Sequence, residues 1–184
     1  MTRMPIVVTV FFVAGTALVA AFLSAGAHAN DRVSVTVNEQ DQRVDISVNG
    51  QPFTSYIWPT KLAKPVLYPL RTAKGTIITR GYPLEPRPGE RVDHPHHAGM
   101  WLNYENVNGI DFWNNSEAIK TKDAPKMGTI QQRAIVSAKG GADQGELEVE
   151  ADWLTYDKKV LLKDHTRYVF RGGANFRSVD RITT

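Results

Sequence analysis

Apolar and polar residues alternate with a period of two along most of this chain beyond its N-terminal segment. Val33–Val37 and Val44–Val48 both show the alternation, which places the apolar side chains on one face of a β-strand. Asn49-Gly50 links the second segment to Gln51–Trp58 and is the strongest dipeptide indicator of a two-residue hairpin turn. Since no helical period of useful length is present, the pattern predicts an all-β protein that opens as a meander.

Further short segments fit strands because Pro- and Gly-rich turns separate them. They are Val66–Leu70, Thr76–Arg80, Met100–Tyr104 and Thr129–Ala138. The best helical candidate is a single turn at Ser116–Lys120 behind Asn115 as a cap. Short strands of this kind predict an all-β fold of antiparallel strands.

The clearest local prediction is a hairpin between Gly145 and Arg171. Its first strand alternates an acidic face with an apolar face that carries Leu147, Val149, Ala151 and Trp153. If Tyr156–Lys159 forms the loop, Thr155 lies opposite Val160 and opposite charges meet across the ladder. The expected pairs are Asp152 with Lys163, Glu150 with His165, Glu148 with Arg167 and Trp153 with Leu162. We therefore expect His165 to be a structural partner of Glu150.

The first residues have the organisation of a secretory signal peptide. Met1-Thr2-Arg3 precedes an apolar run from Ile6 to Leu23, and Ala27-His28-Ala29 is a small-x-small cleavage pattern. We expect cleavage after Ala29, which leaves residues 30–184 as the folded domain. An uncleaved membrane anchor is the alternative, because the run is at the lower limit of a membrane span. After cleavage, no membrane span is expected.

Charge and cysteine content narrow the class of partner and the chemistry. The formal net charge is +3, and no basic block stands out as the phosphate-binding stripe that nucleic-acid recognition needs. We therefore expect no nucleic-acid partner. The absence of Cys excludes disulfides, thiolate metal sites and cysteine nucleophiles. An exported protein without disulfides fits a bacterial periplasm best, or secretion.

Three histidines and a carboxylate gather in Asp93-His94-Pro95-His96-His97, directly after the Pro-rich segment 83–90. Pro95 favours an extended conformation at His94, so His94 and His96 should project to one side while His97 points away. His-x-His on one side can supply two nitrogens to Zn, Fe, Mn or Cu, with a third ligand from elsewhere.

Three interpretations of this cluster stay open. The first is a site for one divalent metal ion on His94 and His96, for which Glu105 and Asp111 are the nearest carboxylates. The second is an acid/base pair or a set of hydrogen-bonding groups for a sugar hydroxyl, because imidazole titrates near neutral pH. The third is a hydrogen-bonded turn with a structural role, in which Asp93 caps backbone N–H groups.

The next segment is rich in aromatic and amide side chains. It contains Trp101, Tyr104, Phe112 and Trp113 among Asn103, Asn106, Asn108, Asn114 and Asn115. Aromatic faces stack on sugar rings and amides bind hydroxyls, although aromatics at strand spacing are more often core. We expect Trp101 and Phe112 to pack in the core and Trp113 to be available as a sugar platform.

Three motifs carry a resemblance to a known family: Thr79–Pro83, Asp93–Trp101 and Val107–Trp113. With them the chain resembles an exported bacterial family of unknown function that carries the label methane oxygenase PmoA, or PmoA-like. Ala98 stands where members of that family usually have Arg. Members usually also continue well beyond the position of Thr184, so the resemblance implies that this chain is an N-terminal portion whose C-terminal strands are missing.

The resemblance implies a periplasmic β-sandwich that works on carbohydrate. The oxygenase chemistry of the label fits poorly, because the true subunit of that name is a bundle of membrane helices and no long apolar stretch follows Leu23 here.

The leading functional prediction is a carbohydrate-active protein, and enzymatic activity stays open. His94 and His96 would be the catalytic pair or the metal ligands, with Asp93 orienting an imidazole. A small-molecule or oligosaccharide ligand would contact His97, Asn108, Trp113 and Arg80. The alternatives are a sugar-binding module without catalysis and a copper- or iron-dependent oxygenase.

Overall fold

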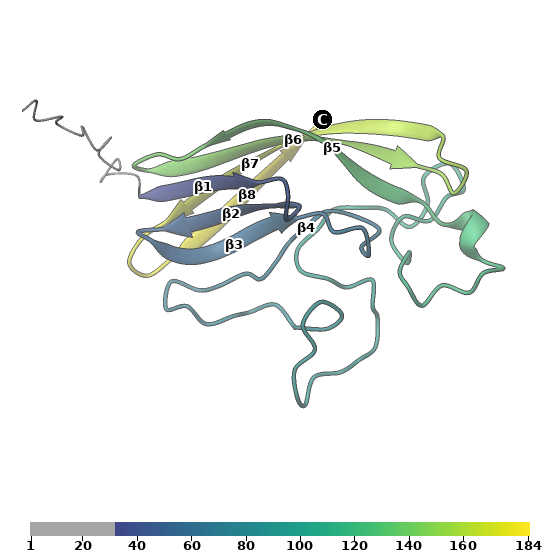
Figure 1. The fold of residues 1–184 in the computed structure, drawn as a ribbon, viewed down its shortest axis with the longest axis horizontal. Coiled ribbons are helices and arrows are strands. Elements are labelled where there is room, and N and C mark those ends of the chain that lie inside the picture. Colours follow the sequence, from purple (N-terminus) through teal and green to yellow (C-terminus); the bar gives the residue numbers. More distant parts are fainter. Residues whose placement is uncertain (1–31) are drawn as a thin grey trace, which may run out of the picture.

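The computed structural model describes residues 32–184, which form two antiparallel four-stranded sheets packed as a sandwich (Figure 1). The first sheet has the order β1 (Val33–Asn38), β2 (Arg43–Val48), β3 (Gln51–Ile57) and β4 (Val66–Leu67). The second has the order β5 (Thr129–Lys139), β6 (Gln144–Leu154), β7 (Val160–Gly172) and β8 (Arg177–Thr183). The predicted all-β sandwich is confirmed. The expected signal peptide and its cleavage site lie outside the described residues.

The opening meander follows from the alternation and its turn. Val44, Ile46 and Val48 are buried on one face of β2. Asn49 and Gly50 have φ values of 52° and 74°, the left-handed conformation that a tight hairpin turn with the right-handed strand twist requires. Residues that accept this conformation at little cost are chiefly Gly and Asn, so this dipeptide sets the pairing of Val48 with Gln51. A bulge between Ile46 and Ser47 shifts the register of the rest of β2 and β3.

The β6–β7 hairpin has the register predicted from its charges. Glu150 is paired with His165 and Asp152 with Lys163, while Leu147 and Val149 are buried on the opposite face. The turn differs by one position because a bulge at the end of β6 pairs Leu154, rather than Thr155, with Val160.

The side chain of His165 does not pair with its register partner. Its Nε2 lies 3.7 Å from Oε2 of Glu148, so the expected contact with Glu150 is wrong in detail. The diagonal neighbour is within reach of a long side chain on the same face. His165 is thus surrounded by strand residues, as a structural partner would be.

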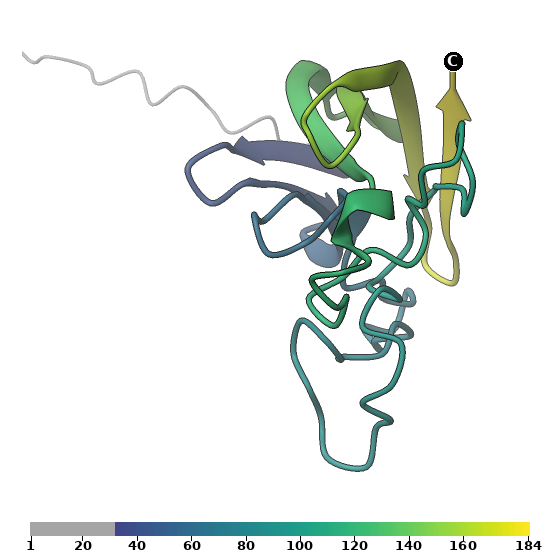
Figure 2. The same ribbon diagram turned by 90° about the vertical axis from the view of Figure 1, so that its right-hand side faces the viewer.

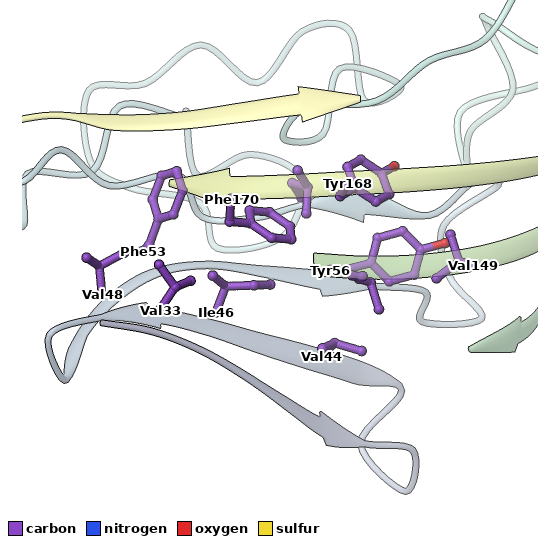
Figure 3. Close-up of a cluster of buried hydrophobic side chains, with 11 residues drawn as sticks. Val33, Val44, Ile46, Val48, Phe53, Tyr56, Val149, Tyr168 and Phe170 are labelled. Atoms are coloured by element: carbon purple, nitrogen blue, oxygen red, sulfur yellow. The ribbon is translucent and has the colours of Figure 1, made fainter. Parts of the chain in front are cut away.

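A core between the sheets holds the sandwich together (Figure 3). Side chains of β2 and β3 meet those of β6 and β7, and Phe53 contacts Phe170 edge to face with ring centroids 6.3 Å apart. Tyr56 and Tyr168 form a second aromatic pair at 5.7 Å. Full burial of a large apolar side chain contributes about 1.5–3 kcal/mol, so this contact between the sheets is the main source of stability.

A long irregular layer lies between β4 and β5 and extends from one side of the sandwich (Figures 1 and 2). Three of the predicted strands lie at or within this layer, and each prediction is wrong in part or in full. Val66–Leu70 is a strand only at Val66–Leu67, because Pro69 has no N–H for a continued ladder. Thr76–Arg80 and Met100–Tyr104 each make one isolated bridge, through Ile77 and Met100, because no neighbouring strand extends alongside them.

The helical turn expected at Ser116–Lys120 is a turn without a helix. The Asn115 side-chain amide donates to the carbonyl of Gly128 at 2.7 Å and to the hydroxyl of Thr129 at 3.4 Å, which ties this side chain to the start of β5. A short 3-10 helix occurs instead at Ala124–Lys126. Among residues 32–184 no helix is long and apolar enough to cross a membrane.

Two buried residues attach the irregular layer to the sheets. Phe112 packs on Trp153 of β6 with ring centroids 4.8 Å apart, which confirms the expected core role of Phe112. Ala98 is buried against Val66 and Tyr68. Next to it, Gly99 has φ +66° and no Cβ, so the chain comes close to the carbonyl of Leu67. The residues before and after the histidines are thereby held in place.

Candidate functional site

The histidine segment is a tight turn. The N–H of His97 donates to the carbonyl of His94 at 2.9 Å, with Pro95 and His96 between them. His94 has φ +49°, so the extended conformation expected before Pro95 is wrong at this position. The preference that proline imposes on its predecessor is local, and the contacts of this turn with the rest of the chain override it.

The turn brings all three imidazoles together. The ring of His97 stacks on that of His94 at 5.1 Å and meets that of His96 edge to face at 4.3 Å. The rings of His94 and His96 are 5.6 Å apart. The expectation that His97 points away is therefore wrong, because the turn folds its ring back over the other two.

Arg80 holds this turn through hydrogen bonds to its first two residues. Its guanidinium donates to the carboxylate of Asp93 at 3.0 Å, and to the backbone carbonyls of Asp93 at 2.5 Å and His94 at 2.6 Å. Its Nε donates to the carbonyl of Tyr82 at 3.1 Å. Charge-assisted hydrogen bonds are about twice as strong as neutral ones, so Arg80 positions the histidine turn. Its predicted contact with substrate stays a prediction.

Asp93 in turn orients an imidazole. Its second carboxylate oxygen lies 3.3 Å from Nδ1 of His94. The hydrogen bond from Arg80, followed by the charge and hydrogen bond of His94, lowers the pKa of Asp93 below its usual range. In the neutral imidazole of His94, an ionised carboxylate at Nδ1 places the proton on that nitrogen and leaves Nε2 as an acceptor. This chain of contacts is the arrangement that positions a general base.

Two indoles and a lysine adjoin the imidazoles. The ring of His97 lies 5.6 Å from that of Trp101 and 5.9 Å from that of Trp113. Lys64 Nζ lies 4.7 Å from the Trp101 ring centroid and donates to the carbonyl of Trp113 at 3.2 Å. Trp101 is half-buried in this cluster, while Trp113 is 39 % exposed, which fits the expectation that its face is accessible.

Asp111 fixes the conformation around Trp113. One carboxylate oxygen accepts from the N–H groups of Trp113 and Asn114 at 2.8 and 2.9 Å, and the other accepts from the Asn114 side chain at 2.8 Å. A short polar side chain that binds the backbone two and three residues on stabilises a turn. This turn follows directly after the buried Phe112, and it directs the side chain of Trp113 toward the histidine rings.

A pocket of about 340 Å³ opens beside the histidine turn. It is enclosed by the segments 61–64, 82–84, 95–98 and 115–118. Its polar lining comes from Lys61, Lys64, Tyr82, His96, Asn115, Ser116 and Glu117. Of the predicted site residues, His96 lines the pocket, while His94, His97 and Trp113 lie in the adjoining ring cluster.

Burial shapes the charges at this pocket. Desolvation, followed by the charges of His97, Lys64 and His94, lowers the pKa of His96 to about 4, so its imidazole is uncharged at neutral pH. Desolvation also lowers the pKa of His97. The pKa of Lys64 falls to about 8 for the same reason, and the charge of Asp111 partly opposes that shift.

Asn108 lies apart from the pocket. It is exposed at a turn closed by backbone hydrogen bonds between Val107 and Ile110, and its φ of 53° beside Gly109 explains the Asn-Gly pair structurally. Its predicted role toward substrate stays a prediction. Lys64 is the residue that sequence reasoning missed, because a single lysine between turn residues carries no sign of its later burial.

The metal interpretation gains no third ligand from the fold. Within the described part of the chain, no group of three or more His, Cys, Asp or Glu side chains is arranged to hold a metal ion. His94 and His96 can supply two nitrogen ligands from one turn, and binding of a divalent ion to them stays a prediction.

Comparison with known proteins places the chain in a family. A family model described as a family of unknown function, DUF6807, matches residues 43–184, and the chain belongs to this family. The matched residues run from β2 to the C-terminal strand and include the whole histidine turn and pocket. No curated protein and no solved structure matches this chain.

Proposed function

We propose that this member of the DUF6807 family is an exported carbohydrate-active protein that binds a sugar in the pocket beside the histidine turn. The pocket volume of about 340 Å³ carries the proposal, because it lies in the range of small-molecule sites and is lined by a few polar groups among apolar walls. A monosaccharide unit fits such a volume.

The lining suits a ring that has hydroxyl groups on its edge and C–H groups on its faces. Ser116 and the imidazole of His96 can each donate or accept a hydrogen bond. Leu84, Pro95 and Ala98 supply apolar surface for the C–H groups of the ring. Polar groups at fixed positions on an apolar wall distinguish one hydroxyl arrangement from another.

The ring cluster next to the pocket supports the catalytic form of this proposal. Asp93, itself held by Arg80, orients the imidazole of His94, whose side chain is 58 % exposed and able to meet a ligand. In that form His94 takes a proton from a sugar hydroxyl, and the exposed face of Trp113 stacks on a second sugar unit. In a sugar-binding module the same groups only hold the ligand.

Binding is tested with purified protein against a panel of mono- and oligosaccharides by calorimetry. His96→Ala removes a pocket wall and is expected to weaken binding of any sugar found by about tenfold or more. His165→Ala is the matched control, because His165 lies on the charged strand face among Glu148 and its neighbours. Equal loss in both variants, or no binding of any sugar by the wild type, would overturn the proposal.

Measuring turnover of a bound oligosaccharide distinguishes an enzyme from a sugar-binding module. If the protein is an enzyme, His94→Ala abolishes turnover of a bound oligosaccharide and leaves its binding within a few-fold of wild type. Turnover by wild type that survives this substitution refutes the role of His94. Binding without turnover in the wild type identifies the module.

Metal analysis of the same samples decides the metal interpretation. One divalent ion per chain that is lost in both His94→Ala and His96→Ala would support it, and with copper or iron it would favour the oxygenase alternative. Protein that binds sugar without stoichiometric metal would refute it.

The proposed export rests on the N-terminal sequence pattern alone. We propose cleavage after Ala29 and residence in the periplasm. N-terminal sequencing of the protein from a periplasmic fraction should give Asn30 as the first residue, and an intact Met1 in the membrane fraction would show an anchor instead.

A further inference from the structure

Lys64 is a buried cation at the wall of the pocket. The residue is 4 % exposed, and it contributes to the pocket lining together with His96. Lysines are almost never fully buried unless they are paired, because the desolvated ammonium needs a compensating charge. The partners of this ammonium therefore decide what the pocket accepts.

The protein satisfies the ammonium only in part. Among the described residues, its one hydrogen bond is to the carbonyl of Trp113, and its Nζ lies 4.7 Å from the ring centroid of Trp101. Within residues 32–184 Lys64 forms no ion pair with a carboxylate. An ammonium has three N–H donors, so two of them have no acceptor among the described residues.

The carboxylate whose charge acts on Lys64 already has other hydrogen-bond partners. Asp111 acts on Lys64 through its charge, yet its two oxygens accept three hydrogen bonds from Trp113 and Asn114. These bonds hold the loop that carries Trp113, so Asp111 cannot turn toward the lysine without releasing it. The missing partner of Lys64 has to come from the pocket side.

The charges around the pocket favour a single negative charge on the ligand. Lys61, Lys64 and Glu117 are its charged lining residues, so their sum is one positive charge while His96 is neutral. Lys61 and Glu117 are exposed, where solvent screens them, whereas Lys64 is buried. A group with one negative charge and several acceptor atoms matches the two free donors, and a carboxylate has both properties.

We propose that the pocket selects an acidic sugar of the uronic acid class, whose carboxylate binds Nζ of Lys64. The inference rests on the proposed function, since the sugar itself comes from there. The carboxylate completes the hydrogen bonds of the ammonium, and the ring hydroxyls extend toward Ser116 and His96.

A purely structural lysine would leave the pocket without preference. Trp101 and Trp113 could pack equally well on an apolar side chain of the same length, and an apolar residue would avoid the cost of a buried charge. The structural role therefore predicts that Lys64→Met binds acidic and neutral sugars as the wild type does.

The test compares glucuronate and galacturonate with glucose, galactose and the methyl ester of glucuronate, which keeps the ring and removes the charge. Calorimetry on wild-type protein should give at least about tenfold tighter binding of one uronate than of its ester and its neutral counterpart. Lys64→Met should abolish that preference, so that the uronate binds no more tightly than its ester. Lys61→Met, at the exposed rim of the same pocket, should retain it.

The outcomes distinguish a failure of the uronate inference from a failure of the proposed sugar-binding function. Equal binding of acidic and neutral sugars by wild type overturns the uronate inference and leaves the sugar site standing. Failure to bind any sugar overturns both. A preference that survives in Lys64→Met overturns the role of Lys64, with Lys64→Gln as the second variant if the first does not fold by circular dichroism.

Discussion

Replacing Lys64 by Met should make the protein more stable at neutral pH. Lys64 is buried, and its ammonium has no carboxylate within ion-pair distance in the described part of the chain. Met has a similar length and retains the packing on Trp101 without the charge. Most core substitutions destabilise, so a gain here would be diagnostic of a charge kept at a cost to the fold.

The size of the effect follows from the pKa. Burial lowers the pKa of Lys64 from 10.5 to about 8, and each pKa unit corresponds to about 1.4 kcal/mol, so the charged form costs the fold about 3 kcal/mol at pH 7. The variant also loses the hydrogen bond to the Trp113 carbonyl, which lowers its stability by about 1 kcal/mol. Lys64→Met should therefore gain about 2 kcal/mol in free energy of unfolding at pH 7.

The gain should disappear in alkali. Below pH 8 the lysine is charged in both the folded and the unfolded chain, so the full cost is present. Between pH 8 and 10.5 the folded lysine is neutral while the unfolded one still binds a proton, so the wild type becomes more stable relative to the variant as pH rises. The neighbouring imidazole of His96 stays uncharged throughout that range, because burial lowers its pKa to about 4.

Urea denaturation of wild type and Lys64→Met at pH 7 and pH 10 measures this directly. The difference in free energy of unfolding should be about 2 kcal/mol at pH 7 and within about 1 kcal/mol of zero at pH 10. Taking the difference between the two proteins removes the contribution of all other titrating groups. A variant that is less stable at pH 7, or a difference independent of pH, would refute the assignment of Lys64 as an unpaired buried cation.

Three further predictions concern the framework of the site. Gly99→Ala should destabilise the protein by more than about 2 kcal/mol in thermal unfolding, because its Cβ would lie 2.4 Å from the Leu67 carbonyl oxygen at a φ of +66°; Gly109→Ala, with φ +86° and nothing within 4 Å, should cost only the backbone conformation, about 1 kcal/mol, and equal losses would contradict the close approach. Arg80→Leu should raise the pKa of Asp93 toward its ordinary value in an NMR titration, since the Arg80 hydrogen bond is the largest cause of its lowering; an unchanged pKa would show that Arg80 does not hold Asp93 in solution. Trp153→Phe should cost about 1–3 kcal/mol by urea denaturation, because its indole N–H donates to the buried carboxylate of Asp164 at 2.7 Å, and a neutral effect would mean that water replaces that bond.

The strands of the sandwich could be predicted because each depends on a pattern within a few residues. Before any tertiary contact is considered, the charges across the β6–β7 ladder predict its register and the Asn49-Gly50 turn predicts where β2 and β3 begin to pair. The errors were at element ends, where one bulge moved the partner of Val160 from Thr155 to Leu154. A bulge depends on packing of the neighbouring strands, which a single hairpin sequence does not contain.

The strand expected at Thr76–Arg80 shows the limit of the pattern. Alternation indicates that a segment is able to form a strand, while a strand exists only where another segment offers its N–H and C=O groups. Here Ile77 finds one partner, Arg71, and the rest of the segment takes part in the irregular layer. By contrast, the prediction that Phe112 lies in the core is confirmed, because a large aromatic side chain needs only an apolar surface to pack against.

The sequence by itself determined the fold class, the opening turn, the main hairpin and the five-residue segment that carries the histidines. Only the tertiary structure decided how those side chains are used. Arg80 reaches Asp93 and Lys64 reaches the carbonyl of Trp113 across long loops, and these contacts set the turn conformation, the ring cluster and the buried charge. Periodicity encodes local geometry, whereas desolvation of a charge depends on everything around it, so the buried lysine in the pocket wall can be recognised only in the folded chain.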